Sequence, residues 1–101
     1  MTYSVIWTAY ASVQLTIVYD FAAQLSESFA DRLLDDIDAR VQQLLKFPFS
    51  GGIEDSFSAF SNEYRYVVCG YCKVIYRVED TAVVIINVFD TRQDPQKMKM
   101  G

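Results

Sequence analysis

The spacing that most resembles a chemical motif is Cys69-Gly70-Tyr71-Cys72, which contains both cysteines of the chain. A CxxC supports redox chemistry when a helix N-terminus lowers a thiol pKa, and it binds zinc when two further ligands are present. Here the motif lies between two strand-like runs, and the sequence has no other cysteine and no histidine. We therefore interpret the cysteines as small apolar residues that flank a hairpin turn, and we expect neither a metal nor a cofactor.

The absence of histidine also narrows the catalytic options, because histidine is the commonest general acid–base group in enzymes. Any catalysis would have to use Asp, Glu, Lys, Arg, Tyr or Cys. The net charge is −4, so the protein as a whole is not attracted to phosphate, although a local positive patch is compatible with that value. These features lean against an enzyme without deciding the question.

The size and composition indicate one small domain. The chain has 101 residues, of which 51% are hydrophobic, and we expect a single domain over residues 1–95 with a short tail over residues 96–101. No apolar run approaches the ~20 residues that a membrane helix needs. The opening residues, MTYSVIW, lack a basic segment followed by an apolar stretch, so we expect a cytoplasmic protein without a signal peptide.

The residue patterns predict an α+β fold in the order β-α-α-β-β-β, with a helical hairpin packed on one face of a small, mostly antiparallel sheet. Strands are expected at residues 3–8, 64–69, 71–78 and 82–89. Helices are expected at residues 9–25 and from an N-cap at Ser28 to about Phe47, where Pro48 ends the helix. Residues 48–63 read as a long loop. Its apolar side chains must be shielded, so we expect it to pack back on the domain: Phe49, Ile53, Phe57 and Phe60.

The two helices differ in their apolar pattern. The second has a single apolar face, typical of core packing, whereas the first has two stripes at roughly 100° per residue. One stripe should cover the sheet: Ala11, Leu15, Val18, Ala22 and Leu25. The other needs a neighbouring helix, another chain or simply a wide core face: Tyr10, Val13, Ile17 and Phe21. In the last strand, alternation places Val84, Ile86 and Val88 on one face, under the helices, with Asn87 and Phe89 on the other.

Several short sequence motifs, which occur in the same order along the chain, resemble those of the RelE/ParE toxin superfamily of bacterial toxin–antitoxin modules. They are VIWT in the first strand, the exit of the second helix at LLKFP, YCKVIYRV in the second hairpin strand and VIINVFDTRQDP at the end. The last two are similar to the family's Y-R-V-I-Y-R-V strand and its closing I-x-V-x-H-x-R-R-D-P. The motifs and the predicted elements that carry the resemblance cover nearly the whole chain.

The resemblance implies one of two activities. RelE-like members cut messenger RNA in the ribosome with cations, a tyrosine and often a histidine or glutamate. The residues here that could serve are Arg65, Lys73, Arg77, Asp90 and Arg92. However, Asp90 stands at the histidine-like position, no tyrosine follows Phe89, and Gln93 replaces the second arginine. The chain is therefore closer to the ParE-like branch, whose members poison DNA gyrase by binding.

Strand alternation leaves the arrangement of these charges open. Arg65 shares a strand face with Val67 and Cys69, while Lys73 and Arg77 share a face of the next strand. A small basic patch is one interpretation, and an ordinary solvated sheet face is the other. For Asp90 and Arg92 we favour a simple pairing that anchors the segment after the last strand.

The resemblance also implies partners. Antitoxins of this family wrap the toxin, so the second stripe on the first helix (Tyr10, Val13, Ile17 and Phe21) is expected to bind the cognate antitoxin. The host target is expected to be DNA gyrase, with the ribosome and its messenger RNA as the alternative, and no membrane is involved. A homodimer and a degenerate, non-toxic binding module also remain open.

Overall fold

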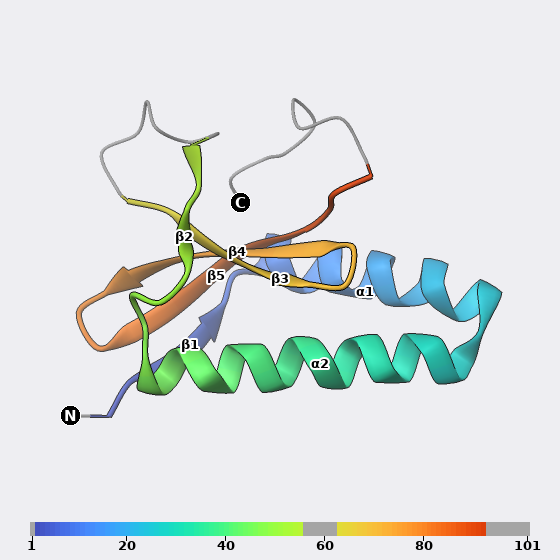
Figure 1. The fold of residues 1–101 in the computed structure, drawn as a ribbon, viewed down its shortest axis with the longest axis horizontal. Helices are drawn as coiled ribbons and strands as arrows, with labels where there is room; N and C mark the ends of the chain where they lie inside the picture. The colour runs from blue at the N-terminus through green and yellow to red at the C-terminus, as the bar shows by residue number, and fades with distance from the viewer. Residues whose placement is uncertain (1, 56–62, 93–101) are drawn as a thin grey trace.

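The computed structural model describes residues 2–55 and 63–92 and confirms the predicted α+β class (Figure 1). Its elements are β1 (Ser4–Trp7), α1 (Ala9–Leu25), α2 (Glu27–Lys46), β2 (Gly52–Ile53), β3 (Arg65–Cys69), β4 (Cys72–Glu79) and β5 (Ala82–Asp90). The short strand β2 lies in the stretch that was expected to be loop throughout. The prediction that Phe49 and Ile53 are shielded is wrong, because both side chains are exposed. Phe57, Phe60 and the tail at 96–101 lie outside the described residues.

The strands form one mixed sheet in the order β1-β5-β4-β3-β2. Strand β1 is parallel to β5, and the other neighbours are antiparallel. Helices α1 and α2 form an antiparallel hairpin on one face of this sheet (Figure 1). Among the helices of the described ranges, none has the length and apolar character required to cross a bilayer.

Helix α2 packs as its sequence predicts, but it begins earlier than expected. Its single apolar stripe is buried: Ala30, Leu33, Ile37, Val41 and Leu44. The predicted N-cap at Ser28 is wrong, because the Ser26 Oγ accepts the hydrogen bond from the Phe29 N–H at 3.2 Å. Ser28 lies inside the first helical turn instead, 3.1 Å from Ser26 through its hydroxyl. In ordinary N-capping, the side-chain oxygen of a serine or threonine accepts a hydrogen bond from the backbone N–H three residues later.

Helix α1 is much less buried than α2. Thr8 caps its start by accepting a hydrogen bond from the Ala11 N–H at 3.1 Å, and only Ala11 and Ala22 are fully buried. Leu15 and Val18 pack partly against the core. The prediction that Leu25 faces the sheet is wrong, because its side chain is 75% exposed. Leu25 ends the helix, and the α1–α2 connection lies beyond the ends of the strands (Figure 1), where no sheet is left to cover it.

A β-bulge in β5 changes which residues face the helices. Ile75 pairs with Asn87 but Tyr76 pairs with Ile85, so Ile86 is an extra residue in β5. Side-chain alternation reverses at a bulge. The prediction that Val84, Ile86 and Val88 share the helix side is therefore wrong: only Val88 packs there, and Val84 and Ile86 join Phe89 on the opposite face.

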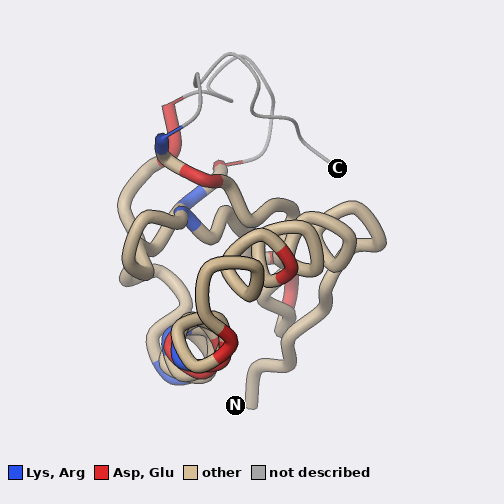
Figure 2. The backbone as a smooth tube through the Cα atoms, turned by 90° about the vertical axis from the view of Figure 1, so that its right-hand side faces the viewer, with Lys and Arg blue, Asp and Glu red and all other residues tan. Residues whose placement is uncertain are grey.

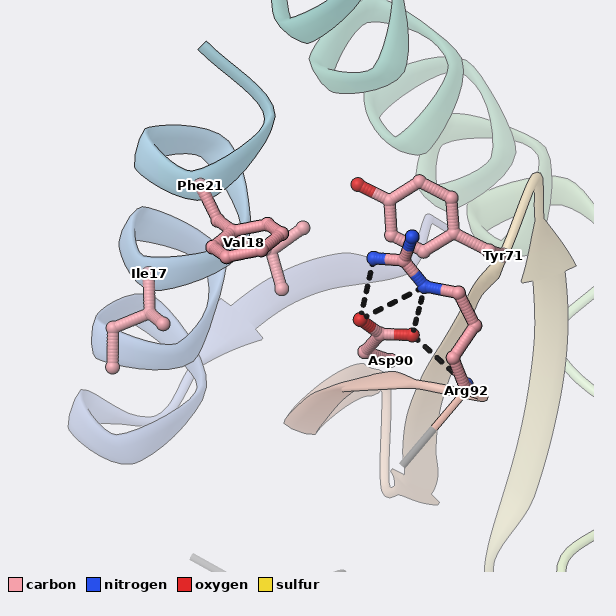
Figure 3. Close-up of a pocket in the computed structure, with 6 residues that line it drawn as sticks. All are labelled: Ile17, Val18, Phe21, Tyr71, Asp90 and Arg92. Carbon is pink, nitrogen blue, oxygen red and sulfur yellow. Dashed lines mark hydrogen bonds and ion pairs between the residues drawn. The ribbon is translucent and has the colours of Figure 1, made fainter. Parts of the chain in front are cut away.

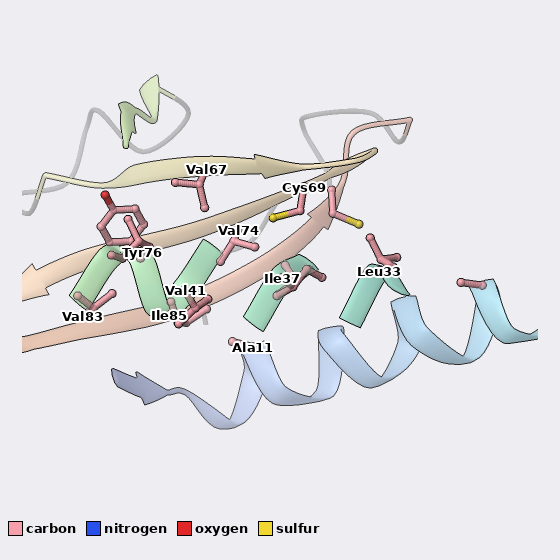
Figure 4. Close-up of a cluster of buried hydrophobic side chains, with 14 of the residues drawn as sticks. Ala11, Leu33, Ile37, Val41, Val67, Cys69, Val74, Tyr76, Val83 and Ile85 are labelled. Carbon is pink, nitrogen blue, oxygen red and sulfur yellow. The ribbon is translucent and has the colours of Figure 1, made fainter. Parts of the chain in front are cut away.

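The main core lies between the helices and the sheet (Figure 4) and includes Tyr76, which is fully buried. The Tyr76 hydroxyl donates to the Pro48 carbonyl at 2.7 Å and accepts from the Gly51 N–H at 3.0 Å. A Cβ at position 51 would come within 2.6 Å of that hydroxyl and 2.7 Å of the Tyr66 carbonyl oxygen. Glycine is therefore required here, and Tyr76 fixes the path of the chain after α2.

Candidate functional site

The four cations that were candidates for RNA cleavage each form an ion pair with a different carboxylate. Arg65 binds Glu63 at 2.6 Å, Lys73 binds Glu54 at 2.9 Å, Arg77 binds Glu79 at 3.1 Å, and Arg92 binds Asp90 at 2.8 Å. The predicted pairing of Asp90 with Arg92 is confirmed. A cation that is already neutralised offers less stabilisation to the developing charge of a transition state.

The sheet register also separates these cations. Arg65 lies opposite Tyr76, which belongs to the core on the helix side, and Arg65 donates further hydrogen bonds to the carbonyls of Phe49 and Gly51. Lys73 lies opposite Phe89 on the other face of the sheet. Arg77 shares that other face, opposite Val84. The basic patch therefore does not form from Arg65 together with Lys73 and Arg77.

Asp90 and Arg92 form the most elaborate of the four pairs. The Asp90 carboxylate accepts from the Arg92 Nε at 3.0 Å, from its Nη2 at 2.8 Å and from its backbone N–H at 2.9 Å. Hydrogen bonds from Arg92 hold the pKa of Asp90 below its usual value, although burial opposes them. Asp90 is therefore a carboxylate at neutral pH and is fully occupied by Arg92.

Aromatic rings hold Arg92 from its other side. Its guanidinium carbon lies 4.0 Å from the centre of the Tyr71 ring, within the range of a cation–π contact. The Tyr71 ring is in turn stacked on Phe29 of α2, with 6.2 Å between ring centres. Arg92 is thus positioned by both the sheet and the helical hairpin.

The predicted antitoxin-binding stripe is largely solvent-exposed. Val13, Ile17 and Phe21 are each 55% exposed, and Tyr10 is half-buried. Three large apolar side chains on one helix face form an exposed patch that is unusual unless something binds it. The alternative of a wide core face does not hold for these three residues. Antitoxin binding itself stays a prediction.

A pocket connects this stripe to the end of β5, and the sequence did not predict the connection. The pocket has a volume of about 120 Å³ and is lined by Ile17, Val18, Phe21, Tyr71, Asp90 and Arg92. Figure 3 shows the apolar residues of α1 facing the Arg92–Asp90 pair across it. The signal in the sequence is weak, because the residues come from three segments far apart in the chain. We call the stripe and this hollow together the α1–β5 site.

The cysteines occupy the predicted structural positions. Cys69 and Cys72 pair across the two-residue turn of the β3–β4 hairpin, and both are free and buried. Gly70 takes a φ of 57° there, which suits the tight hairpin turn. Burial raises the pKa of Cys72 to about 12. The Cys72 thiol is therefore protonated at neutral pH and is a poor nucleophile.

The fold has a solved counterpart. It is similar to a structure described as "Chromosomal ParDE TA system from P. aeruginosa", with a TM-score of 0.71 and 21% sequence identity, over 87% of this chain and 95% of that chain. This likeness defines the class, a small α+β protein with a helical hairpin on a mixed sheet. No curated protein matches the chain significantly.

The sequence identifies the family within that class. The family described as "ParE toxin of type II toxin-antitoxin system, parDE" matches residues 5–95, nearly the whole chain. The chain belongs to the ParE toxin family, as its motifs and element order had indicated.

Proposed function

We propose that this ParE-family protein is a toxin that inhibits a host machine by binding to it rather than by cutting RNA, and that DNA gyrase is the target. The observation that supports binding most strongly is that the candidate catalytic cations are already paired with carboxylates. Arg65, Lys73 and Arg77 are each neutralised by a carboxylate and are divided between two faces of the sheet. Together with the lack of histidine, this leaves no convergent set for general acid–base catalysis among the described residues.

We further propose that a cognate antitoxin neutralises the protein by docking on the α1 stripe. An amphipathic or extended peptide binds such a surface by covering its apolar residues. Val13, Ile17 and Phe21 are suited to this role because their removal from water would stabilise a complex while the fold does not depend on them. The matching family and the solved counterpart both belong to ParDE toxin–antitoxin systems, which supports the expectation of such a partner.

The target is tested by inducing the chain in bacterial cells and comparing two responses. We expect growth arrest with a DNA-damage response, and inhibition of supercoiling by purified gyrase. Translation arrest with cleavage of messenger RNA in ribosome extracts, lost in Arg65→Ala or Arg92→Ala, would instead establish the ribosome-dependent endoribonuclease. Growth without arrest would establish a non-toxic binding module.

The docking surface is tested with the cognate antitoxin, which is first identified by searching for a small reading frame beside this gene and co-expressing its product. We expect Ile17→Asp to abolish co-purification with that antitoxin while thermal unfolding stays close to that of the wild type. Thr16→Asp is the matched control, because Thr16 is an exposed neighbour that lies off the stripe. If Ile17→Asp unfolds the protein, or if both variants bind equally well, the stripe is not the docking surface.

A further inference from the structure

We propose that the hollow of the α1–β5 site binds one branched aliphatic side chain of the antitoxin, and that Arg92 binds a carboxylate of the same antitoxin segment. This inference rests on the proposed docking at α1 and specifies its chemistry. It assigns to Arg92 a role in partner recognition, in addition to its ion pair with Asp90.

The aliphatic part follows from the walls and the size of the hollow. Ile17, Val18 and Phe21 supply one side of it, and the Tyr71 ring contributes to the other (Figure 3). An apolar cavity of roughly 150 Å³ holds benzene, so a hollow of about 120 Å³ has room for the side chain of valine, leucine or isoleucine. Burying such a side chain is favourable because its apolar surface leaves water.

The carboxylate part follows from the exposure of Arg92 and from its N–H donors that do not bind Asp90. A guanidinium has five N–H donors, and Asp90 accepts from Nε and Nη2. The Nη1 group makes no contact with Asp90 and lies on the side of the guanidinium away from it (Figure 3). The Arg92 side chain is 53% exposed, the most accessible cation of the four ion pairs. A second carboxylate can therefore approach it from solvent.

The distribution of charge makes Arg92 selective for an acid. Asp90 accepts from the Nε and Nη2 edge of the guanidinium and is itself 15% exposed, whereas Arg92 is 53% exposed. At the rim of the hollow the accessible charged group is therefore the cation. Figure 2 shows both acidic and basic positions along α2, and the acidic residues of this helix outnumber the basic ones. A carboxylate on the partner is therefore less favourable along α2 than at the exposed Arg92 donors that Asp90 does not bind, which would fix the register of the bound segment.

The test measures the affinity of the purified cognate antitoxin, identified as described above, for variants of this chain. We expect Arg92→Gln to weaken binding by roughly tenfold to a hundredfold, the usual range for losing a charge-assisted hydrogen bond. Val18→Met, which extends into the hollow, should also weaken binding. Arg77→Gln is the matched control, because Arg77 is likewise an ion-paired arginine but does not line the hollow. Thermal unfolding of each variant identifies any that fail to fold.

Exchanging the charges of Arg92 and its partner residue is the decisive experiment. Arg92→Glu should lose binding, and changing one acidic residue of the antitoxin to arginine should restore it for this variant alone. If Arg92→Gln, Val18→Met and Arg77→Gln all bind within twofold of the wild type while Ile17→Asp does not bind, this inference is overturned and the docking surface on α1 stands. If Ile17→Asp also binds normally, the docking proposal fails as well.

As a probe independent of the antitoxin, 3-methylbutanoate combines a branched aliphatic group with a carboxylate. In a millimolar NMR titration it should shift the resonances of Val18 and Tyr71, and 3-methylbutan-1-ol should do so several-fold more weakly. Equal effects of the acid and the alcohol would remove Arg92 from the interaction. Loss of the difference in Arg92→Gln would support its role.

Discussion

Helices α1 and α2 lie side by side on the same sheet, yet they are held in different ways. Helix α2 buries a continuous stripe that includes Ile37 and Val41 and keeps its charges in solvent. Helix α1 touches the core mainly through the small residues Ala11 and Ala22, and it carries Ile17 and Phe21 on its exposed side. Small residues let α1 approach the sheet closely while its large apolar side chains remain available. The difference indicates that α2 contributes more to the stability of the fold, and it supports the proposal that α1 serves recognition.

The largest difference between the two helices is expected when one isoleucine on each is truncated and the loss of stability is compared. Ile37→Ala should destabilise the protein by about 2–5 kcal/mol, because it leaves a cavity in the core. Ile17→Ala, the matched change on α1, should stay within about 0.5 kcal/mol of the wild type, as surface substitutions usually do. Urea denaturation measures both. Equal losses of stability would show that α1 is as much a part of the core as α2.

The second test concerns the hydroxyl groups that hold each helix. Tyr76→Phe removes a buried hydroxyl that bonds Pro48 and Gly51 after α2, and the loss should be about 1–3 kcal/mol. Tyr19→Phe removes the exposed hydrogen bond from α1 to Asp31, and its effect on the urea midpoint should be much smaller. A larger effect for Tyr19 would mean that the hydrogen bond between α1 and α2 stabilises the protein more than the hydrogen bonds of Tyr76 after α2 do.

The third test concerns the start of α2. Ser26→Ala removes the N-cap that accepts from Phe29 and should destabilise the protein by about 1 kcal/mol. Ser28→Ala is the control, because Ser28 lies within the helix and alanine favours a helix there. Thermal unfolding should therefore separate the two variants. If Ser28→Ala is the more harmful change, the capping assignment is wrong.

The smallest expected effect is the pH dependence of the Asp90–Arg92 pair. Arg92 lowers the pKa of Asp90 below 3.8, so the pair stabilises the fold above that pH and loses this contribution as the pH falls through the lowered pKa. Asp90→Asn should unfold at a slightly lower temperature than the wild type at pH 6, and the gap should close on acidification below 3.8. A gap that is unchanged at about pH 3 would contradict the pairing.

Elements that depend on local sequence were predicted well. The stripe of α2, the turn between Cys69 and Cys72, and the ion pair of Asp90 with Arg92 all follow from spacing within a few residues. Alternation also placed Lys73 and Ile75 correctly on one strand face. These features are set by periodicity and turn chemistry, which a single sequence contains.

Features that depend on tertiary contacts were missed. Nothing near Ile86 marks the bulge, which is visible only when Ile75 and Tyr76 are paired with β5. The exposure of Leu25 depends on where the sheet ends, and the α1–β5 site depends on Arg92 meeting α1 in space. Sequence reasoning found the stripe and the ion pair separately, but it could not show that they border one pocket.

The parallel pairing of β1 with β5 has a consequence for how the protein is made. Val5 pairs with Val83, and β5 is bonded on its other side to β4. The ribosome releases the chain from its N-terminus, so β1 has no neighbour in the sheet until β5 has emerged. Closing so long a loop is entropically unfavourable and slow. A chain whose synthesis has not passed Asp90 therefore cannot complete the five-stranded sheet.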